Sequence, residues 1–194
     1  GHAPGLRGAD ARKYIATGIT TDHECASLEE AEEKLLAGMR ILIREGSAAR
    51  NFDALHPLIS KYPGRTMLCT DDLDAADLAN GHIDRLVARA IAAGHDVFTV
   101  LEAACLTPRQ HYGLDIGGVR PGERFTAVLL DDLVGVRPRR TWLAGELVAE
   151  DGACLLPRAE PLPINAFGAE PVAASDLVVP ASNVADQTAR CRVI

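Results

Sequence analysis

Three side chains in the first half of the chain combine the chemistry of metal ligands with positions beside predicted strands. His2 lies near the start, His23 follows the apolar run Ile15–Thr20, and Asp71 follows Thr66–Thr70. Loops at the carboxyl ends of parallel strands meet on one rim, so these side chains are expected to converge. Two imidazoles and a carboxylate are suitable ligands for zinc, manganese or ferrous iron. Two simpler interpretations stay open: histidines that only satisfy polar contacts, and an aspartate that caps the next helix.

Signatures of several other chemistries are missing from the sequence. The six histidines form no H-x-H pair and no H-E-x-x-H motif, which argues against the usual zinc-protease site. A P-loop, a G-x-G-x-x-G loop and a G-x-S-x-G elbow are also absent. A metal centre built from separated residues is therefore the chemical hypothesis that the sequence favours.

The composition of the 194 residues is that of an ordered soluble domain, with 47% hydrophobic and 24% charged residues. A net charge of −7 argues against nucleic-acid binding, which needs a basic surface. No apolar run approaches the roughly 20 residues of a membrane span, and no secretory signal is visible, so we expect no membrane partner. The five cysteines are widely spaced without a C-x-x-C pair, which favours reduced thiols and a cytoplasmic location.

Short β-like runs alternate with amphipathic patterns over the first hundred residues. The predicted strands are Ile15–Thr20, Arg40–Arg44 and Thr66–Thr70. A helix is predicted to begin after Ser27, because Ser27 and Glu30 form a capping box. Its expected buried face consists of Leu28, Ala31, Leu35, Leu36 and Met39. Further helices are predicted over Phe52–Ile59 and along the apolar positions from Leu78 to Ile91. This alternation predicts an α/β fold with a parallel sheet.

The pattern changes after residue 96. Helices are predicted over Val97–Cys105 and from Thr107, with Thr107 as the cap and Pro108 at the first position. The segment 113–122 is rich in turn residues and precedes the predicted strands Phe125–Leu130, Arg139–Leu143 and Glu146–Val148. Five prolines follow residue 151, which is typical of a linker. The missing initiator methionine and the apolar last residues lead us to expect a piece of a longer protein.

Several strings resemble a known family when they are taken in order. They are Gly1–Leu6, Tyr14–Ile19, Asp22–Glu24, Ile43–Asn51, Met67–Asp72 and Gly81–Asp84. Together they resemble the second half of the catalytic barrel of the bacterial adenine deaminases, which are members of the amidohydrolase superfamily. Two later strings, Gly113-Leu114 and Gly118–Gly122, resemble the exit from that barrel into a small β domain.

The resemblance implies a domain organisation. Residues 1–112 would form the C-terminal half of a TIM-like (β/α)8 barrel, containing strands about five to eight. Residues 113–150 would belong to the small β domain. Residues 151–194 would be a linker and the start of a truncated C-terminal domain. The fold class expected is therefore α/β: a partial barrel followed by a small β unit and an irregular tail.

The resemblance also implies a site. His2 and His23 match metal-ligand histidines after the fifth and sixth strands, and Asp71 matches the aspartate after the eighth, which contacts metal and transfers protons. Contacts to the substrate or to the metal ligands are implied for Glu24, Glu45, Ser47 and His82. For Glu24 the residues alone also allow a helix cap or a solvent-facing carboxylate. Glu45 and Ser47 could equally belong, with Arg44, to an internally paired polar cluster.

The implied activity is the hydrolysis of adenine to hypoxanthine and ammonia, assisted by a divalent metal, with Mn or Fe(II) favoured over Zn. The full-length form is expected to be a homo-oligomer. The H-x-H pair after the first strand and the carboxylate after the fourth, both typical of the superfamily, are missing from this sequence. Two alternatives stay open: an amidohydrolase acting on another cyclic amidine or amide, and a truncated relic without catalysis.

Overall fold

The computed structural model describes residues 1–160, 162, 164–166 and 168–177. The chain divides into two units, Gly1–Leu156 and Pro157–Ile194. In the second unit, the described part contains the 3-10 helix η2 (Ala174–Leu177). Among the described residues, none of the helices has both the length and the apolar character needed to cross a membrane.

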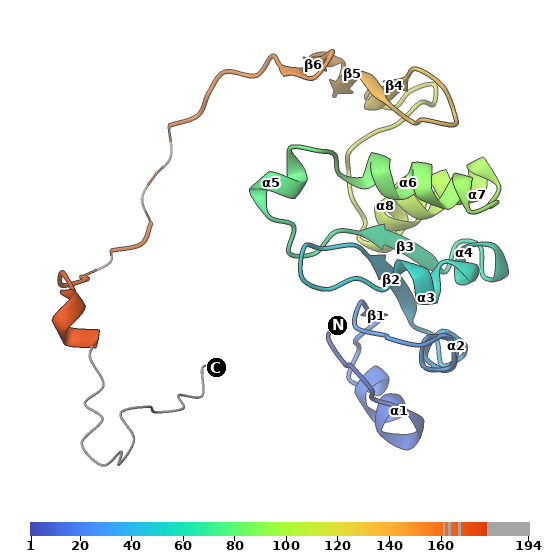
Figure 1. Cartoon of the computed structure of the whole chain (residues 1–194). Coiled ribbons are helices and arrows are strands. Elements are labelled where there is room, and N and C mark those ends of the chain that lie inside the picture. The colour runs from blue at the N-terminus through green and yellow to red at the C-terminus, as the bar shows by residue number, and fades with distance from the viewer. Residues whose placement is uncertain (161, 163, 167, 178–194) are drawn as a thin grey trace. The chain divides into compact units, whose positions relative to one another are not determined.

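A three-stranded parallel sheet positions the site. Its strands are β1 (Thr21–Asp22), β2 (Arg40–Arg44) and β3 (Thr66–Cys69), in the order β1-β2-β3 (Figure 1). All three strands run the same way, so their carboxyl ends lie at one edge. The central strand β2 places Ile41 and Ile43 in the core, where neither side chain is exposed. The mixed α/β class is thereby confirmed, although the described strands form no closed barrel.

Helices connect and cover the strands. Along the chain they are α1 (Gly8–Ala16), α2 (Leu28–Leu36), α3 (Phe52–Leu55), α4 (Pro57–Lys61), α5 (Ala75–Leu78), α6 (Ile83–Ala92), α7 (Val97–Leu101), the π-helix η1 (Glu102–Leu106) and α8 (Thr107–His111). Helices α2 and α3 lie against β2, whereas α6, η1 and α8 lie against β3 (Figure 1). Apolar side chains from these helices and from the sheet form one buried cluster.

A four-stranded antiparallel sheet follows within the same unit. Its strands are β4 (Ala127–Leu130), β5 (Pro138–Leu143), β6 (Glu146–Glu150) and β7 (Ala153–Cys154). The turn between β5 and β6 contains Ala144 and Gly145, both with positive φ, as a tight hairpin requires. The small β unit is therefore confirmed, and β7 is an addition that the sequence pattern did not indicate.

Several local predictions are wrong. The run Ile15–Thr20 is not a strand, because α1 continues to Ala16 and the following Gly18 has a φ of 93°. Leu36 does not join the buried face of α2; its exposed fraction is 77%. Thr107 is not a cap, because η1 continues directly into α8 and Thr107 lies inside the helical segment.

The apolar positions from Leu78 to Ile91 belong to two helices rather than one. Gly81, with a φ of 143°, separates α5 from α6. Four cysteines lie in the part of the chain that the structure describes, and all four are free thiols. Cys25 is buried, whereas Cys105 and Cys154 are exposed. Cys191 lies outside the described residues.

Candidate metal centre

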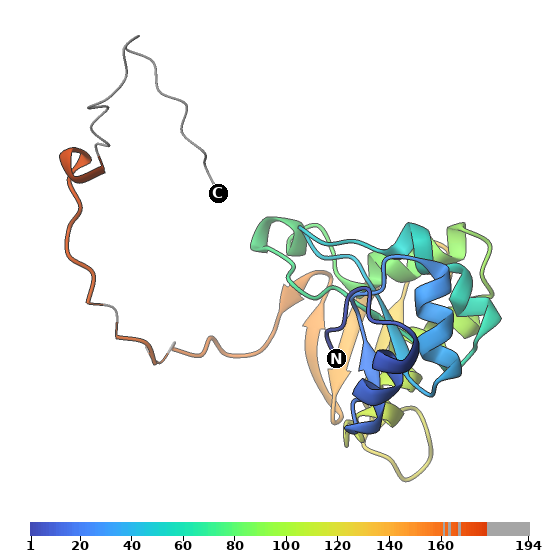
Figure 2. The same ribbon diagram turned by 90° about the horizontal axis from the view of Figure 1, so that it is seen from below.

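The structure brings together the three side chains that carry the metal hypothesis. His23 follows β1, Asp71 follows β3, and His2 belongs to the N-terminal segment, whose Gly1 amino group lies 3.0 Å from Thr21 Oγ1 on β1. Figure 2 marks the position of this N-terminal end. The ring centroids of His2 and His23 are 5.4 Å apart in an edge arrangement. His23 Nε2 lies 3.6 Å from Asp71 Oδ2. Residues from distant parts of the sequence therefore meet at the carboxyl edge of the parallel sheet.

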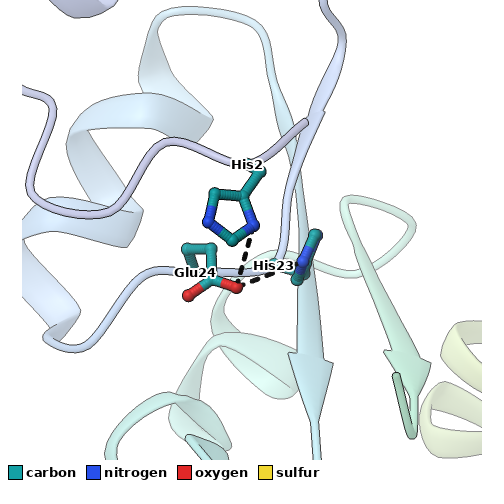
Figure 3. Close-up of side chains that lie close together, drawn as sticks. All are labelled: His2, His23 and Glu24. Atoms are coloured by element: carbon teal, nitrogen blue, oxygen red, sulfur yellow. Dashed lines mark ion pairs between the residues drawn. The ribbon is translucent and has the colours of Figure 1, made fainter. Parts of the chain in front are cut away.

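Glu24 lies at the centre of this group. One of its carboxylate oxygens, Oε1, is 3.2 Å from His2 Nδ1 and 3.2 Å from His23 Nε2 (Figure 3). The ligand atoms of His2, His23 and Glu24 all lie within 4.8 Å of one another. The alternative role of Glu24 as a helix cap is wrong, because Ser27 Oγ caps α2 by accepting a hydrogen bond from the Glu30 amide.

Arg44 occupies the other side of the two carboxylates. Its guanidinium lies 2.7 Å from Glu24 Oε1 and also contacts Asp71 Oδ2. Arg44 ends β2, the strand between β1 and β3, so its side chain emerges between the loops that carry the two acids. Arg44 was not among the predicted site residues. Its position at the end of the central predicted strand is the feature of the sequence that could have indicated it.

Asp71 does not cap the following helix. That role belongs to Asp74, whose side chain accepts a hydrogen bond from the Asp77 amide at 2.8 Å. Asp71 itself has a φ of 56°, a left-handed conformation that aspartate adopts more readily than most residues. With the backbone in this conformation, the Asp71 carboxylate contacts both His23 and Arg44.

Glu45 and Ser47 are paired with side chains of other elements. Glu45 accepts hydrogen bonds from the Phe52 amide and from Arg89. Ser47 donates to Asp77 Oδ2 at 2.6 Å. The proposed internal pairing of these two residues with Arg44 is therefore wrong, since the structure shows different partners for each.

His82 lies beyond the end of β3, with Nε2 3.1 Å from Thr70 Oγ1. A cavity of about 610 Å³ is lined in part by Glu45, Thr70 and His82. A second cavity of about 680 Å³ is lined by Glu24, Arg44 and Glu45 among others. Glu45 thus lines both cavities, and Glu24 lines the second one.

A buried amide connects the loops that carry the site. Asn51 donates hydrogen bonds to the backbone oxygens of His23 and Cys25, at 3.2 and 3.1 Å. Its Oδ1 accepts a hydrogen bond of 2.8 Å from the Arg44 amide. Because Asn51 is 9% exposed, these bonds are largely shielded from water. The loop after β1 is thereby fixed against the end of β2.

The donor set suits a divalent cation. Imidazole nitrogens and carboxylate oxygens are ligands for zinc, manganese and ferrous iron, and here they face one another at the edge of a parallel sheet. The fold and the site together define an α/β protein with a candidate metal centre.

Comparison with known proteins gives a specific relationship. No protein-family model matches the chain. The adenine deaminase of Salinibacter ruber is 53% identical over 181 residues, which cover 93% of this chain and 33% of that protein. The adenine deaminases of Methanosarcina mazei and Borreliella burgdorferi are 46% and 44% identical over 97% and 98% of this chain. These alignments cover 34% and 36% of the two proteins.

The chain is therefore homologous to a segment of the adenine deaminases, and the resemblance stated from its motifs is confirmed. The chain spans about a third of the length of the curated relatives it matches.

Proposed function

We propose that this chain is the part of an adenine deaminase that holds metal ligands and transfers the proton in the hydrolysis of adenine to hypoxanthine and ammonia. The observation that carries this proposal is the meeting of His2, His23 and two carboxylates at one edge of the sheet. The names of the homologous proteins supply the substrate. The proposed protein is cytoplasmic and forms homo-oligomers at full length.

The proposed architecture is part of a (β/α)8 barrel. The strands β1, β2 and β3 are parallel, adjacent and in chain order, and helices connect each to the next. Successive strands of such a barrel have this arrangement, with the active site at their carboxyl ends. We assign β1 to β3 to the sixth, seventh and eighth strands, which is consistent with the matches of His23 and Asp71.

The proposed metal is Mn or Fe(II), with Zn as a further possibility. His2 and His23 would hold it as neutral imidazoles, together with the carboxylate of Asp71 and with Glu24 on the side facing both rings. A divalent cation in this position would lower the pKa of water, so that water could act as a nucleophile near neutral pH.

Asp71 performs the proton transfers in this proposal. Its carboxylate takes one proton from the attacking water while the water oxygen bonds to C6 of adenine. The bond from C6 to the amino nitrogen then breaks, and Asp71 returns its proton to that nitrogen, which leaves as ammonia. The oxygen stays on the ring as the carbonyl of hypoxanthine, and the second proton of the water moves from this oxygen to ring nitrogen N1. Arg44, in contact with Asp71, fixes the direction of the carboxylate.

The substrate side of the site is proposed to include Glu45 and His82, which line the same cavity. Ser47 is assigned a supporting role, because its hydroxyl is engaged with Asp77. Glu24 is proposed to face the cation as a further ligand, because its Oε1 lies 3.2 Å from His2 Nδ1 and from His23 Nε2, the ring nitrogens that would hold the cation.

A chimera tests the proposal. The homologous third of the Salinibacter ruber adenine deaminase is replaced by this chain, and release of hypoxanthine and ammonia is measured with Mn²⁺. We expect turnover of adenine, with much slower turnover of guanine, cytosine and adenosine. Asp71→Asn should lower kcat by roughly 10²- to 10⁴-fold, the usual effect of losing a proton-transferring group. A folded chimera that is inert on adenine, or an Asp71→Asn variant with unchanged turnover, would contradict the proposal.

A further inference from the structure

A buried lysine lies behind the candidate metal centre. Lys34, on α2, is 1% exposed. Its Nζ donates to Asp22 Oδ2 at 2.6 Å, to Glu30 Oε1 at 2.7 Å and to the Ala3 carbonyl at 2.7 Å. All three hydrogens of the ammonium group therefore have a partner.

Two of the three partners of Lys34 belong to the segments that carry the histidines. Ala3 is adjacent to His2, and Asp22 is adjacent to His23. The Asp22 carboxylate also accepts hydrogen bonds from the Ala3 amide at 3.2 Å and from the Glu24 amide at 3.0 Å. A single aspartate thus joins the backbone beside His2 to the backbone of the loop that carries His23.

Glu30 provides a second connection from α2. Its carboxylate accepts hydrogen bonds from the Gly5 amide at 2.8 Å and from the Ala26 amide at 3.3 Å. Gly5 lies on the N-terminal segment, and Ala26 lies on the loop after β1. The two acids that neutralise Lys34 are therefore the same two that fasten both histidine-bearing segments.

The ammonium group of Lys34 and the carboxylates of Asp22 and Glu30 compensate one another's charge in this buried cluster. Asp22 is completely buried, and burial alone would raise the pKa of its carboxyl; hydrogen bonds from Lys34 and from the Glu24 amide instead hold that pKa below its ordinary value. Removing one partner from a buried ion pair leaves an uncompensated charge, whereas apolar replacements of a whole pair are often tolerated. Replacing Lys34 alone therefore leaves Asp22 and Glu30 as buried carboxylates without their cation.

We propose that Lys34 is a positioning residue that sets His2 against His23 and Glu24. It acts through its contacts with the Ala3 carbonyl and with Asp22, and it does not touch the metal centre itself. The inference rests on the proposed function for its effect on metal binding, while the positioning of the two rings can be measured without metal.

The first test uses the metal-free 194-residue chain. The edge arrangement of the His2 and His23 rings predicts a nuclear Overhauser cross-peak between their ring protons. Lys34→Met should abolish this cross-peak. The control Lys13→Met, which removes an exposed lysine paired with Asp10, should retain it. A folded Lys34→Met chain that keeps the cross-peak would overturn the inference whatever the metal binding shows.

The second test separates positioning from general destabilisation. Binding of Mn²⁺ is followed by the electron paramagnetic resonance signal of the free ion. Lys34→Met should weaken binding by about tenfold or more, the usual effect of losing support behind a metal ligand. In a His2→Ala background the same substitution should have a clearly smaller effect, because the ring that Lys34 sets against His23 is gone and only the contact through Asp22 remains. An equal loss in both backgrounds would overturn the inference.

Glu30→Gln provides a milder variant if Lys34→Met does not fold. It keeps the size of the side chain and leaves Lys34 paired with Asp22. We expect it to weaken Mn²⁺ binding a few-fold, again less so in the His2→Ala background, and an unchanged affinity would count against the inference. If the wild-type chain binds no Mn²⁺ and His2→Ala does not change that result, the proposed function fails. The cross-peak between the His2 and His23 rings still tests whether Lys34 positions them.

Discussion

The Glu24 carboxylate lies between two imidazoles on one side and the guanidinium of Arg44 on the other. With neutral imidazoles, the two carboxylates of Glu24 and Asp71 exceed the single cation by one negative charge. A cation brought to the histidines therefore meets a favourable field, although Arg44 competes with it for the same oxygens.

Arg44→Met tests this competition. Removing the guanidinium frees both Glu24 and Asp71, whose carboxylates then attract a divalent cation without a rival charge. We expect Mn²⁺ to bind the 194-residue chain roughly threefold to tenfold more tightly, a change of about 1 kcal/mol. Binding is measured by titration, and Arg124→Met, which removes an exposed arginine paired with Asp115, serves as the control. Weaker binding by the Arg44 variant would show that the guanidinium supports the site rather than competes with it.

The candidate site could be predicted only in part from residue types. His2, His23 and Asp71 were selected because imidazoles and a carboxylate near predicted strands suit a metal, and the family resemblance strengthened the choice. Arg44 was missed, because arginines are common at strand ends and the sequence does not show which way the side chain points. Glu24 lies at the centre of the site because of the way the loop after β1 turns. Residue types alone do not predict the conformation of this loop.

Helix α2 connects the local sequence to the site. Its cap Ser27 was predicted from the capping box and is confirmed by the hydrogen bond of 3.3 Å from the Glu30 amide to Ser27 Oγ. The same helix carries Glu30 and Lys34, whose charged groups contact the segments of both histidines. The start of the helix and the arrangement of the site are therefore linked.

Ser27→Ala should destabilise the chain. Loss of the cap leaves the Glu30 amide without its partner, and such substitutions cost about 1 kcal/mol. The free energy of unfolding is measured by urea denaturation. Ser27→Asp, which keeps an oxygen acceptor at the cap, should restore most of the stability. Equal losses for both variants would contradict the role of this cap.

The histidines that lie away from the site predict a pH dependence. His95 Nε2 lies 2.9 Å from His56 Nδ1, and His95 Nδ1 lies 2.6 Å from Ser60 Oγ on α4. Burial, together with the nearby His56, lowers the pKa of His95 below 6.5. The unfolded chain therefore binds a proton more readily, so stability is complete above about pH 6.5 and falls as the pH drops below it.

Urea denaturation between pH 5 and 7.5 measures this effect. The free energy of unfolding should rise with pH up to about 6.5 and then level off. His95→Gln should reduce the slope below pH 6.5, because the titrating imidazole is gone. A slope of the opposite sign in the wild-type chain would be incompatible with the lowered pKa of His95.

Elements with a clear pattern were predicted well even where they are short, as for the four-residue strand β3, whereas the two-residue strand β1 was not. The strand Arg40–Arg44 and the capped helix after Ser27 have clear periodicity and are confirmed. The strand β1 has only two residues, so no alternation marks it, and the apolar run Ile15–Thr20 predicts a strand at the end of α1 instead. Tertiary hydrogen bonds with β2 decide where β1 lies.

At the scale of the whole molecule, the described residues leave much apolar surface uncovered. Large exposed fractions occur at Leu36 with 77%, Phe98 with 71% and Val134 with 76%. In addition, β1 and β3 form the two edges of the parallel sheet, with no further strand on either side among the described residues. Unpaired strand edges and exposed apolar side chains both favour association.

We therefore expect the 194-residue chain on its own to self-associate. Sedimentation velocity should show a weight-average mass that increases with protein concentration. Insertion of the chain in place of the homologous segment of the Salinibacter ruber adenine deaminase should reduce this dependence on concentration, because the strand edges then gain neighbours. A chain that sediments as a monomer at all concentrations would contradict the expectation.

The central claim is that the imidazoles of His2 and His23 and the carboxylates beside them hold one divalent cation. Anomalous diffraction at the manganese edge, from crystals of the chain soaked in Mn²⁺, tests it most directly. We predict a peak roughly 2.0–2.3 Å from His2 Nδ1, from His23 Nε2 and from a carboxylate oxygen of Glu24 or Asp71. A peak at another place, such as the His56 and His95 pair, with none between residues 2 and 23, would contradict the account.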